Sequence, residues 1–363
     1  MQNFSKTILN WYRRNKRELP WRDESDPYKI WVSEIILQQT RIAQGWNYYL
    51  RFVERFPNVR SLAEASQDEV LKHWQGLGYY SRARNLHAGA KYIMDAHAGV
   101  FPDNHADILK IKGVGEYTAA AIASMAFQLP FPAVDGNVFR VLTRIFGIDT
   151  PIDTSAGKKE ISKLATQLID TQSAGLFNQA IMDFGALQCT PAMPKCEDCC
   201  FSASCIAKKQ NLTALLPVKS LKTNIKTRYF YYLHLINGEK NYIRKRSDKD
   251  IWQGLYEFPL IESEKALPQD EILNHSYLID TLKNCRWEVV KFSPIYKHQL
   301  THQTIFGQRI VLKINSGSPQ MGENIIPILE KDLPQYPISR LMERLLFPSP
   351  HSTIHGRLRA GYQ

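Results

Sequence analysis

The sequence lacks any apolar run near the roughly 18 uninterrupted residues that a membrane-spanning helix needs. Its first residues, MQNFSKTILNWYRRNKR, lack the hydrophobic region of a signal peptide. It also lacks internal repeats and low-complexity tracts. These absences argue against a membrane-spanning or repeat architecture, and we expect a cytoplasmic protein with no membrane partner. The 363 residues, 44% of them hydrophobic, suffice for two or three globular domains.

Acidic residues are scarce relative to basic ones, with 35 Asp and Glu against 46 Lys and Arg. The resulting formal charge of +11 and the pI near 9.2 favour a polyanionic partner, because neutralised phosphates release condensed counterions. A basic surface that is merely solvated would give the same numbers. Charge alone therefore leaves both interpretations open.

Cysteine is also sparse, with six residues, most of which fall in one short window. In a cytoplasmic chain this pattern does not indicate structural disulfides and points to a metal site. The window CTPAMPKCEDCCFSASC has the spacing C-x6-C-x2-C-x5-C, formed by Cys189, Cys196, Cys199 and Cys205. Four thiolates bind either zinc or a [4Fe–4S] cluster, and ligand type alone does not separate the two. Cys200 could replace Cys199 in this set, while Cys285 stands far away and is most simply a small core residue.

The N-terminal part of the chain reads as one large helical region. Residues 1–207 carry recurring amphipathic patterns, and Asp26 followed by Pro27 is typical of an N-cap and the first residue of a helix. Residues 208–227 are polar, basic and interrupted by a proline, which indicates a linker.

The C-terminal part has a different composition. Residues 228–347 predict an α+β domain, with a hairpin at Asn237–Gly238, several more strands up to about residue 314 and a helix in ISRLMERLLF. Residues 348–363 are basic and have no apolar period, so we expect a disordered tail there.

Two glycines one residue apart precede an Ala-rich stretch in KGVGEYTAAAI. A dinucleotide-binding G-x-G-x-x-G motif needs a third glycine, where this chain has Thr118, and a preceding strand, where NHADILKIK favours a helix. A helix, then Gly113-Val114-Gly115, then a second helix is instead a helix-hairpin-helix pattern. Its glycines let the backbone approach a phosphate, the dipole of the second helix favours an anion, and Lys112 adds a cation. A tight interhelical turn without a ligand is the alternative.

Two acidic residues lie in apolar surroundings. Glu34 shares a helix face with Ile30 and Leu37, so its carboxyl would be desolvated and its pKa raised, as suits a general acid near neutral pH. Asp135 follows the apolar PFPAV and precedes another helix. Glu34 could instead pair with an arginine at the edge of the core, and Asp135 could be a simple N-cap. Two carboxylates in protected but different settings match the chemistry of glycosidic-bond cleavage.

These features occur together in the helix-hairpin-helix DNA glycosylase superfamily, and the cysteine spacing is that of its endonuclease III branch. Within that branch the chain resembles the MutY-type adenine DNA glycosylases through LPWR, WVSEIILQQT, GLGYYSRARNLH, GVGEYTAAAI, VDGNVFRVLTR and NQAIMDFGALQCT. The resemblance continues through the second region to about residue 345. It implies a mainly α glycosylase region with an iron–sulfur cluster loop, followed by an α+β Nudix-like domain.

The resemblance also implies an activity and a cofactor. The expected substrate is double-stranded DNA with adenine opposite 8-oxoguanine, and the adenine would be flipped out of the helix. By family analogy, Glu34 protonates adenine at N7 and Asp135 stabilises the oxocarbenium ion and its covalent successor before water attacks. Tyr117 and Asn137 match positions that orient the catalytic groups. The family further implies a [4Fe–4S] cluster on the four cysteines, and we expect a monomer.

Several other residues match family positions that contact DNA. Gln39 and Thr40 match the probe of the base opposite adenine, and Tyr79 matches a wedge that enters the base stack. The hairpin residues Lys112, Gly113, Val114 and Gly115 would grip the backbone, and the base pocket would be formed by Trp21, Arg22, Leu37 and Met182. Gln179 stands where some relatives carry glutamate, which leaves its role in doubt. Tyr79 could instead belong to the core, and Gln39 could be a solvated helix residue.

The second region departs from two family patterns. It lacks the Arg-Glu-x-x-Glu-Glu run that binds metal in Nudix hydrolases, so a diphosphate hydrolase is disfavoured. Where relatives recognise 8-oxoguanine through Phe-Ser-His, KHQLTHQ supplies Leu300, Thr301 and His302, and a leucine cannot stack as a phenylalanine does. The alternatives are a bifunctional endonuclease III-type glycosylase and lyase, which needs a lysine where Tyr117 stands, and a lesion-binding protein without catalysis.

Overall fold

The computed structural model describes residues 2–220, 225–247, 249–322 and 324–348. These residues fall into two compact units. The first holds the described residues up to Ala65 and those from Asn85 to Ser220, and the second holds Ser66–Arg84 and the described residues from Ile225 onward. No helix in these described ranges is both long and apolar enough to cross a membrane.

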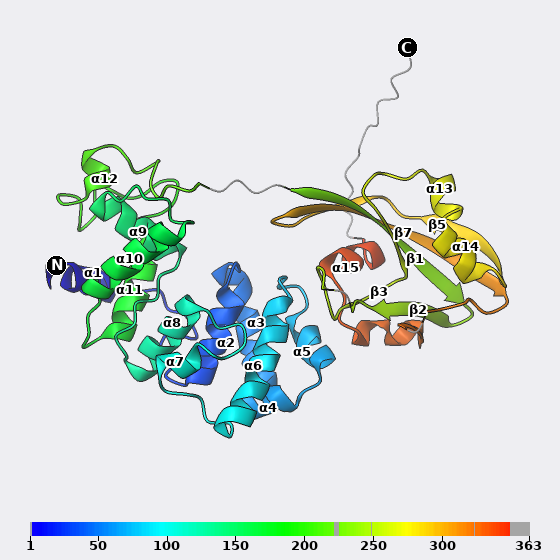
Figure 1. Cartoon of the computed structure of the whole chain (residues 1–363), viewed down its shortest axis with the longest axis horizontal. Coiled ribbons are helices and arrows are strands. Elements are labelled where there is room, and N and C mark those ends of the chain that lie inside the picture. The colour runs from blue at the N-terminus through cyan, green and yellow to red at the C-terminus, as the bar shows by residue number, and fades with distance from the viewer. Residues whose placement is uncertain (1, 221–224, 248, 323, 349–363) are drawn as a thin grey trace, which may run out of the picture. The chain divides into compact units, whose positions relative to one another are not determined.

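The first unit is helical, which confirms the predicted class of the N-terminal region. Its helices, with α6 beginning in the segment assigned to the second unit, are α1 (Gln2–Asn15), α2 (Pro27–Leu37), α3 (Ile42–Arg55), α4 (Val59–Glu64), α6 (Ser81–His97), α7 (His105–Ile108), α8 (Glu116–Phe127), α9 (Gly136–Phe146), α10 (Ser155–Leu168), α11 (Ala174–Leu187) and α12 (Ile206–Lys209) (Figure 1).

Local sequence explains where these helices begin and which face they bury. As predicted, Asp26 caps α2 by accepting a hydrogen bond from the Tyr28 backbone, and Pro27 opens the helix. Helix α2 is apolar on nearly every side and is buried almost throughout its length. Helix α9 buries residues at the i, i+3, i+4 and i+7 spacing, namely Val138, Val141, Leu142 and Ile145, in a core shared with α1 and α11, and it packs against α11.

The glycine turn between α7 and α8 has the helix-hairpin-helix form predicted from the sequence. Gly113 has φ of +81°, in the left-handed region that favours glycine. A Cβ atom added there would lie 2.5 Å from the Cβ of Asn85, so the turn also needs glycine for space. Gly115 is the N-cap of α8, has φ of −103° and faces open space.

The second unit is built on one mixed sheet. Its strands are β1 (Lys226–Asn237), β2 (Lys240–Lys245), β3 (Tyr256–Glu257), β4 (Leu260–Ser263), β5 (Arg286–Phe292), β6 (Tyr296–Gln299), β7 (Gln303–Ser316) and β8 (Ile325–Leu329). The long strands β1 and β7 pair in parallel at its centre, with Lys226 opposite Gln303. The other pairs are antiparallel, including the predicted hairpin between β1 and β2.

Helices cover both faces of this sheet, so the predicted α+β class is confirmed. Helices α13 (Gln269–Leu273) and α14 (Ser276–Leu282) lie on one side and α15 (Arg340–Leu346) on the other (Figure 1). Leu233 and its neighbours on one face of β1 form a core with α13 and α14, and Cys285 packs against it as expected. Gly307 of β7 lies directly under Leu341 of α15. The unit also contains α5 (Gln67–Trp74) and a 3-10 helix, Glu330–Gln335.

Two sequence predictions fall wholly or partly beyond what the structure describes. The expected tail, residues 348–363, lies outside the described residues apart from Pro348. The expected linker, residues 208–227, overlaps the end of α12 and the start of β1, and its residues 221–224 lie outside the described ranges.

Candidate active site

A cavity of about 800 Å³ opens in the helical unit. It receives side chains from α2 and its C-terminal end, from the N-terminal ends of α8 and α9, and from α11. All eight residues that the sequence assigned to catalysis and to the base pocket line it, namely Trp21, Arg22, Glu34, Leu37, Tyr117, Asp135, Asn137 and Met182. Three of the predicted DNA-binding residues, Gln39, Thr40 and Gly115, line it as well. Residues distant in the sequence therefore converge on one site.

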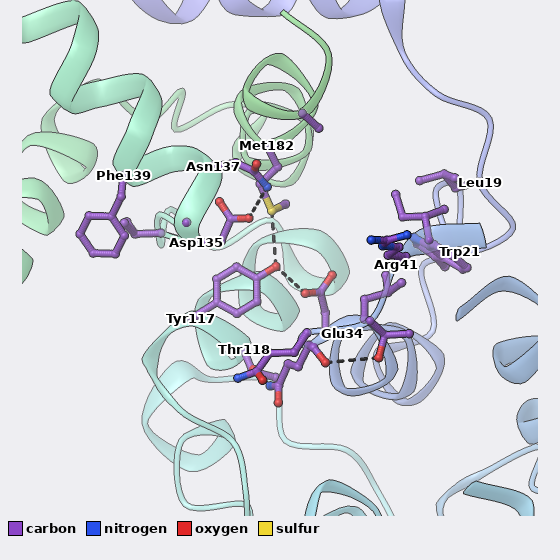
Figure 2. Close-up of a pocket in the computed structure, with 18 of the residues that line it drawn as sticks. Leu19, Trp21, Glu34, Arg41, Tyr117, Thr118, Asp135, Asn137, Phe139 and Met182 are labelled. Carbon is purple, nitrogen blue, oxygen red and sulfur yellow. Dashed lines mark hydrogen bonds between the residues drawn. The ribbon is translucent and has the colours of Figure 1, made fainter. Parts of the chain in front are cut away.

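Glu34 projects from α2 into this cavity and is only 8% exposed, as its apolar helix face predicted. The hydroxyl of Tyr117 donates a hydrogen bond of 2.6 Å to Oε2 of Glu34, and the two side chains are turned toward each other in Figure 2. Burial raises the pKa of the Glu34 carboxyl, and Asp135 adds to that rise. The hydrogen bond from Tyr117 and the charge of Arg22 oppose it.

Asp135 is the N-cap of α9, and it lines the same cavity. Its Oδ1 accepts a hydrogen bond of 2.8 Å from the backbone of Val138, and its Oδ2 accepts one of 2.7 Å from Nδ2 of Asn137 (Figure 2). Burial raises the pKa of Asp135, while these donors and the charge of Arg140 counter the effect. The N-cap interpretation is thus correct, and it coexists with a place in the cavity.

The two carboxyls have different surroundings, which suits them to different protonation states. Asp135 accepts hydrogen bonds from two donors at the start of a helix, where the helix dipole also favours negative charge. Glu34 accepts one hydrogen bond, from Tyr117, in a largely apolar setting. Proximity of two carboxylates disfavours ionising both. The geometry therefore favours Glu34 as the proton donor and Asp135 as the anion.

A buried carboxylate anchors two arginines beside the cavity. Asp183, with no exposed side-chain area, accepts hydrogen bonds from Arg17 and Arg22, both of which line the cavity. Arg22 Nε is buried, and no hydrogen-bond partner for it occurs among the described residues. Gln179 is not among the described residues that line the cavity. Its Oε1 accepts from the Tyr12 hydroxyl at 3.0 Å, and its Nε2 donates to the Arg22 carbonyl at 3.2 Å.

Two of the residues predicted to contact DNA, Gln39 of the base probe and Tyr79 of the wedge, have a left-handed backbone. Gln39 has φ of +55° and Tyr79 has φ of +45°, a conformation that costs of order 1–3 kcal/mol outside glycine and clusters at functional sites. Tyr79 is 46% exposed, so it is not a core residue. The hairpin residues Lys112 and Gly113 are exposed, Val114 is buried, and Gly115 alone of these four lines the cavity.

The second unit contains its own cavity, of about 470 Å³. It is lined by Tyr79 from the segment Ser66–Arg84 and by the predicted recognition loop, Leu300, Thr301 and His302. The hydroxyls of Tyr79 and Thr301 share a hydrogen bond. This loop connects β6 to β7 and is closed by a hydrogen bond of 2.8 Å from the Leu300 backbone to the Gln303 carbonyl.

The four cysteines of the predicted metal site line a third, small cavity together with Arg144 and Lys208, while Cys200 is exposed. Nη1 of Arg144 lies 3.6 Å from Sγ of Cys189 and donates at 2.7 Å to the Thr190 carbonyl. Lys208 donates to Ser202 at 2.6 Å. Cationic side chains beside the four cysteines would stabilise negative charge on cysteine sulfurs that bind a metal or a cluster.

Sequence reasoning missed Arg140 and Arg144, whose guanidinium groups hold the cysteine segment onto α9, and it missed Asp183. Arg140 is 8% exposed and Arg144 2%, although both are arginines. The sequence did contain a sign of these residues, because two arginines four residues apart interrupt the apolar spacing of α9, and one aspartate interrupts that of α11. A charge in such a position needs a partner.

Comparison with known proteins gives the same assignment for both units. Residues 32–169 match the HhH-GPD superfamily of base excision DNA repair proteins, and residues 231–347 match the NUDIX domain. The adenine DNA glycosylase of Buchnera aphidicola subsp. Baizongia pistaciae is 36% identical over 86% of this chain and 86% of its own length. That of Arabidopsis thaliana is 33% identical over 86% of this chain and 58% of its own.

Solved structures resemble the helical part of the chain. A thermostable thymine-DNA glycosylase superposes with a TM-score of 0.54 at 31% identity, covering 58% of this chain and 96% of its own. An endonuclease III trapped on DNA has a TM-score of 0.51 over the same shares, and at 22% identity it shows the fold alone.

The hairpin, the two carboxyls that share one cavity and these matches define the class of the protein. It is a helix-hairpin-helix base excision DNA glycosylase, an enzyme that hydrolyses N-glycosidic bonds in DNA. Within that class, a 36% identical relative matched over 86% of its length shows that the chain belongs to the adenine DNA glycosylase family. The resemblance noted from the sequence motifs is confirmed.

Proposed function

We propose that the chain removes adenine mispaired with 8-oxoguanine, or with guanine, as a monofunctional and monomeric glycosylase. The observation that carries the proposal is the pair of differently bonded carboxyls, Glu34 and Asp135, in one cavity with Tyr117 hydrogen-bonded to the first. The relatives named adenine DNA glycosylases support adenine as the excised base. The volume of about 800 Å³ can admit a flipped nucleotide.

The mechanism divides between the two carboxyls. Glu34 donates its proton to N7 of the flipped adenine, which weakens the bond to the sugar and makes the base a better leaving group. Asp135, held by Asn137 and the start of α9, stabilises the oxocarbenium ion and its covalent successor until water attacks C1′. Tyr117 orients the Glu34 carboxyl. Tyr117 also stands where a lyase would have its lysine, and a tyrosine side chain forms no Schiff base.

Recognition of the opposite base would use both units. Gln39 and Thr40 of the helical unit line its cavity and would probe the base left behind. Leu300, Thr301 and His302 line the cavity of the second unit with Tyr79, the proposed wedge. The hairpin at Lys112, Gly113, Val114 and Gly115 would hold the phosphate backbone through the N-terminus of α8.

A [4Fe–4S] cluster is the proposed occupant of the cysteine cavity, held by Cys189, Cys196, Cys199 and Cys205. Among the described residues, no three Cys, His, Asp or Glu side chains approach closely enough to hold a single metal ion. The four cysteines line one cavity with Arg144 and Lys208, and their spacing is that of the endonuclease III branch, so they would hold the cluster rather than one zinc ion. Iron and acid-labile sulfide assays on the purified chain test the assignment, and stoichiometric zinc without iron would contradict it.

Strand scission after alkali tests the activity. Duplexes with adenine opposite 8-oxoguanine, adenine opposite guanine, thymine glycol and normal pairs are incubated with excess enzyme. We expect cleavage of the adenine strand in the first two only. Borohydride should trap no covalent complex, because no amine attacks C1′. A trapped complex, or cleavage at thymine glycol, would instead indicate a bifunctional lyase.

A further inference from the structure

Gln303 lines the cavity of the second unit directly after the proposed recognition loop. It is the first residue of β7, and its Oε1 accepts a hydrogen bond of 2.9 Å from Nη1 of Arg228. The neighbouring residue of β1, Lys226, donates its backbone N–H to the His302 carbonyl at 3.0 Å. The carbonyl of Gln303 accepts a hydrogen bond of 2.8 Å from the Leu300 backbone, so Gln303 is fixed through both its backbone and its side chain.

Arg228 is itself held rigidly. Its guanidinium pairs with both oxygens of Asp250, at 3.0 and 2.6 Å, and with both oxygens of Glu262, at 2.7 and 2.8 Å. It also lies 4.9 Å from the centre of the Phe230 ring, and the residue is only 7% exposed. Two bidentate pairs leave the guanidinium no freedom to rotate.

This arrangement dictates which end of the Gln303 amide faces the cavity. A guanidinium has only donors, so the amide must present its oxygen to Arg228 and turn its NH₂ elsewhere. Arg228 is not among the described residues that line the cavity, whereas Gln303 is. Within the described part of the chain, the side chain of Gln303 makes one hydrogen bond, the one that its Oε1 accepts, and Nε2 takes no part in it. The atom left to face the cavity is thus a donor.

A donor at this place distinguishes the two bases that can stand opposite adenine. 8-Oxoguanine carries a carbonyl oxygen at C8, where guanine has only a hydrogen. We propose that Gln303 is a specificity-determining residue whose Nε2 donates to O8 of 8-oxoguanine, and that Arg228 is the residue that positions it. The inference rests on the proposed function. It supplies a polar contact in a loop where Leu300 cannot provide aromatic stacking.

Gln299, in the same hairpin, offers a matched control. It lines the same cavity, but its side chain is committed within the hairpin. Its Nε2 donates to the Leu300 carbonyl at 3.1 Å, and its Oε1 accepts from the Thr304 hydroxyl at 2.9 Å. An apolar substitution there disturbs the loop without removing a donor that faces the cavity.

The test measures single-turnover adenine excision by the full-length chain opposite three bases: 8-oxoguanine, guanine and 8-methylguanine, which fills position 8 without an acceptor. We expect Gln303→Leu to slow excision opposite 8-oxoguanine by about five- to tenfold, the effect of one hydrogen bond, and to leave the other two rates unchanged. Gln303→Glu should slow excision opposite 8-oxoguanine further, because a carboxylate oxygen would face O8 and repel it. Gln299→Leu, which keeps the Gln303 donor, should lower the preference for 8-oxoguanine less than Gln303→Leu does.

A double-mutant cycle tests the role of Arg228. If Arg228 acts through the amide, Arg228→Lys should lower the preference for 8-oxoguanine, and adding it to Gln303→Leu should cause no further loss. Gln303→Leu leaves both acidic partners of Arg228 in place, so its melting temperature should stay near that of the wild type. An unchanged preference, or an equal loss opposite all three bases, would overturn the inference. Absence of adenine excision by the wild type would instead overturn the proposed function.

Discussion

Replacement of Glu34 by glutamine tests the division of labour between the two carboxyls. The amide keeps the shape of the side chain, and its oxygen can still accept the hydrogen bond that Tyr117 donates. Only the transferable proton is lost. A general acid contributes about 10²–10⁴-fold in rate, which corresponds to about 2.7–5.4 kcal/mol of the barrier. We expect excision to slow by that factor while affinity for the mispair is retained.

The same variant should be more stable than the wild type at neutral pH. Because burial raises the pKa of Glu34 above its ordinary value of 4.5, the protonated form favours the fold. That contribution is complete below the ordinary value and is lost as pH rises through the raised pKa. At neutral pH the wild type must either bury a charged carboxylate or take up a proton on folding, and the amide avoids both costs. Thermal unfolding should show the largest gain at neutral pH and little gain near pH 4.

The assays are single-turnover excision with excess enzyme, mispair binding, and thermal unfolding across pH. Glu116→Gln serves as a control, because Glu116 lines the same cavity but its side chain is 81% exposed. It should keep near-normal excision. A Glu34→Gln enzyme that excises adenine within about tenfold of the wild-type rate would refute Glu34 as the acid, given the range above. Unchanged stability across pH would refute the electrostatic argument separately.

Further predictions follow from the same geometry. Tyr117→Phe removes the donor that favours the Glu34 anion, so the pKa of Glu34 should rise further and the alkaline limb of the pH–rate profile should move to higher pH, with a lower maximum. Gly113→Ala should lower both the melting temperature and DNA affinity, because it combines strain at φ of +81° with a steric clash, whereas Gly115→Ala should keep the fold and can weaken only DNA binding. Arg140→Lys should lower excision by at least about tenfold and reduce bound iron per chain, both measured on one preparation.

Local signals were sufficient to predict much of the fold. An N-cap aspartate before a proline placed the start of α2, a glycine pair placed the turn before α8, and Asn237–Gly238 placed the hairpin of β1 and β2. Each of these depends on backbone preferences of a few adjacent residues, which a single sequence displays directly.

Long-range pairings could not be predicted in the same way. The parallel pairing of β1 with β7 joins Lys226 to Gln303, and nothing in either strand specifies the other. The buried pairs of Arg228 have the same origin, because its partners lie 22 to 75 residues away. The left-handed backbones of Gln39 and Tyr79 were also hidden, since neither residue type favours that conformation.

Helix α9 joins two parts of the site that the sequence presents as separate motifs. Its N-cap is Asp135, and Arg140 donates to Oδ1 of Asn137 at 2.8 Å and to the Cys189 carbonyl at 2.8 Å. One guanidinium therefore contacts both the residue that donates to Asp135 and the first proposed cluster ligand. Displacement of the cysteine segment would withdraw an anchor from Arg140 and loosen Asn137. A cluster bound there would thus aid excision by fixing the position of Asp135, the proposed catalytic aspartate, which requires no electron transfer.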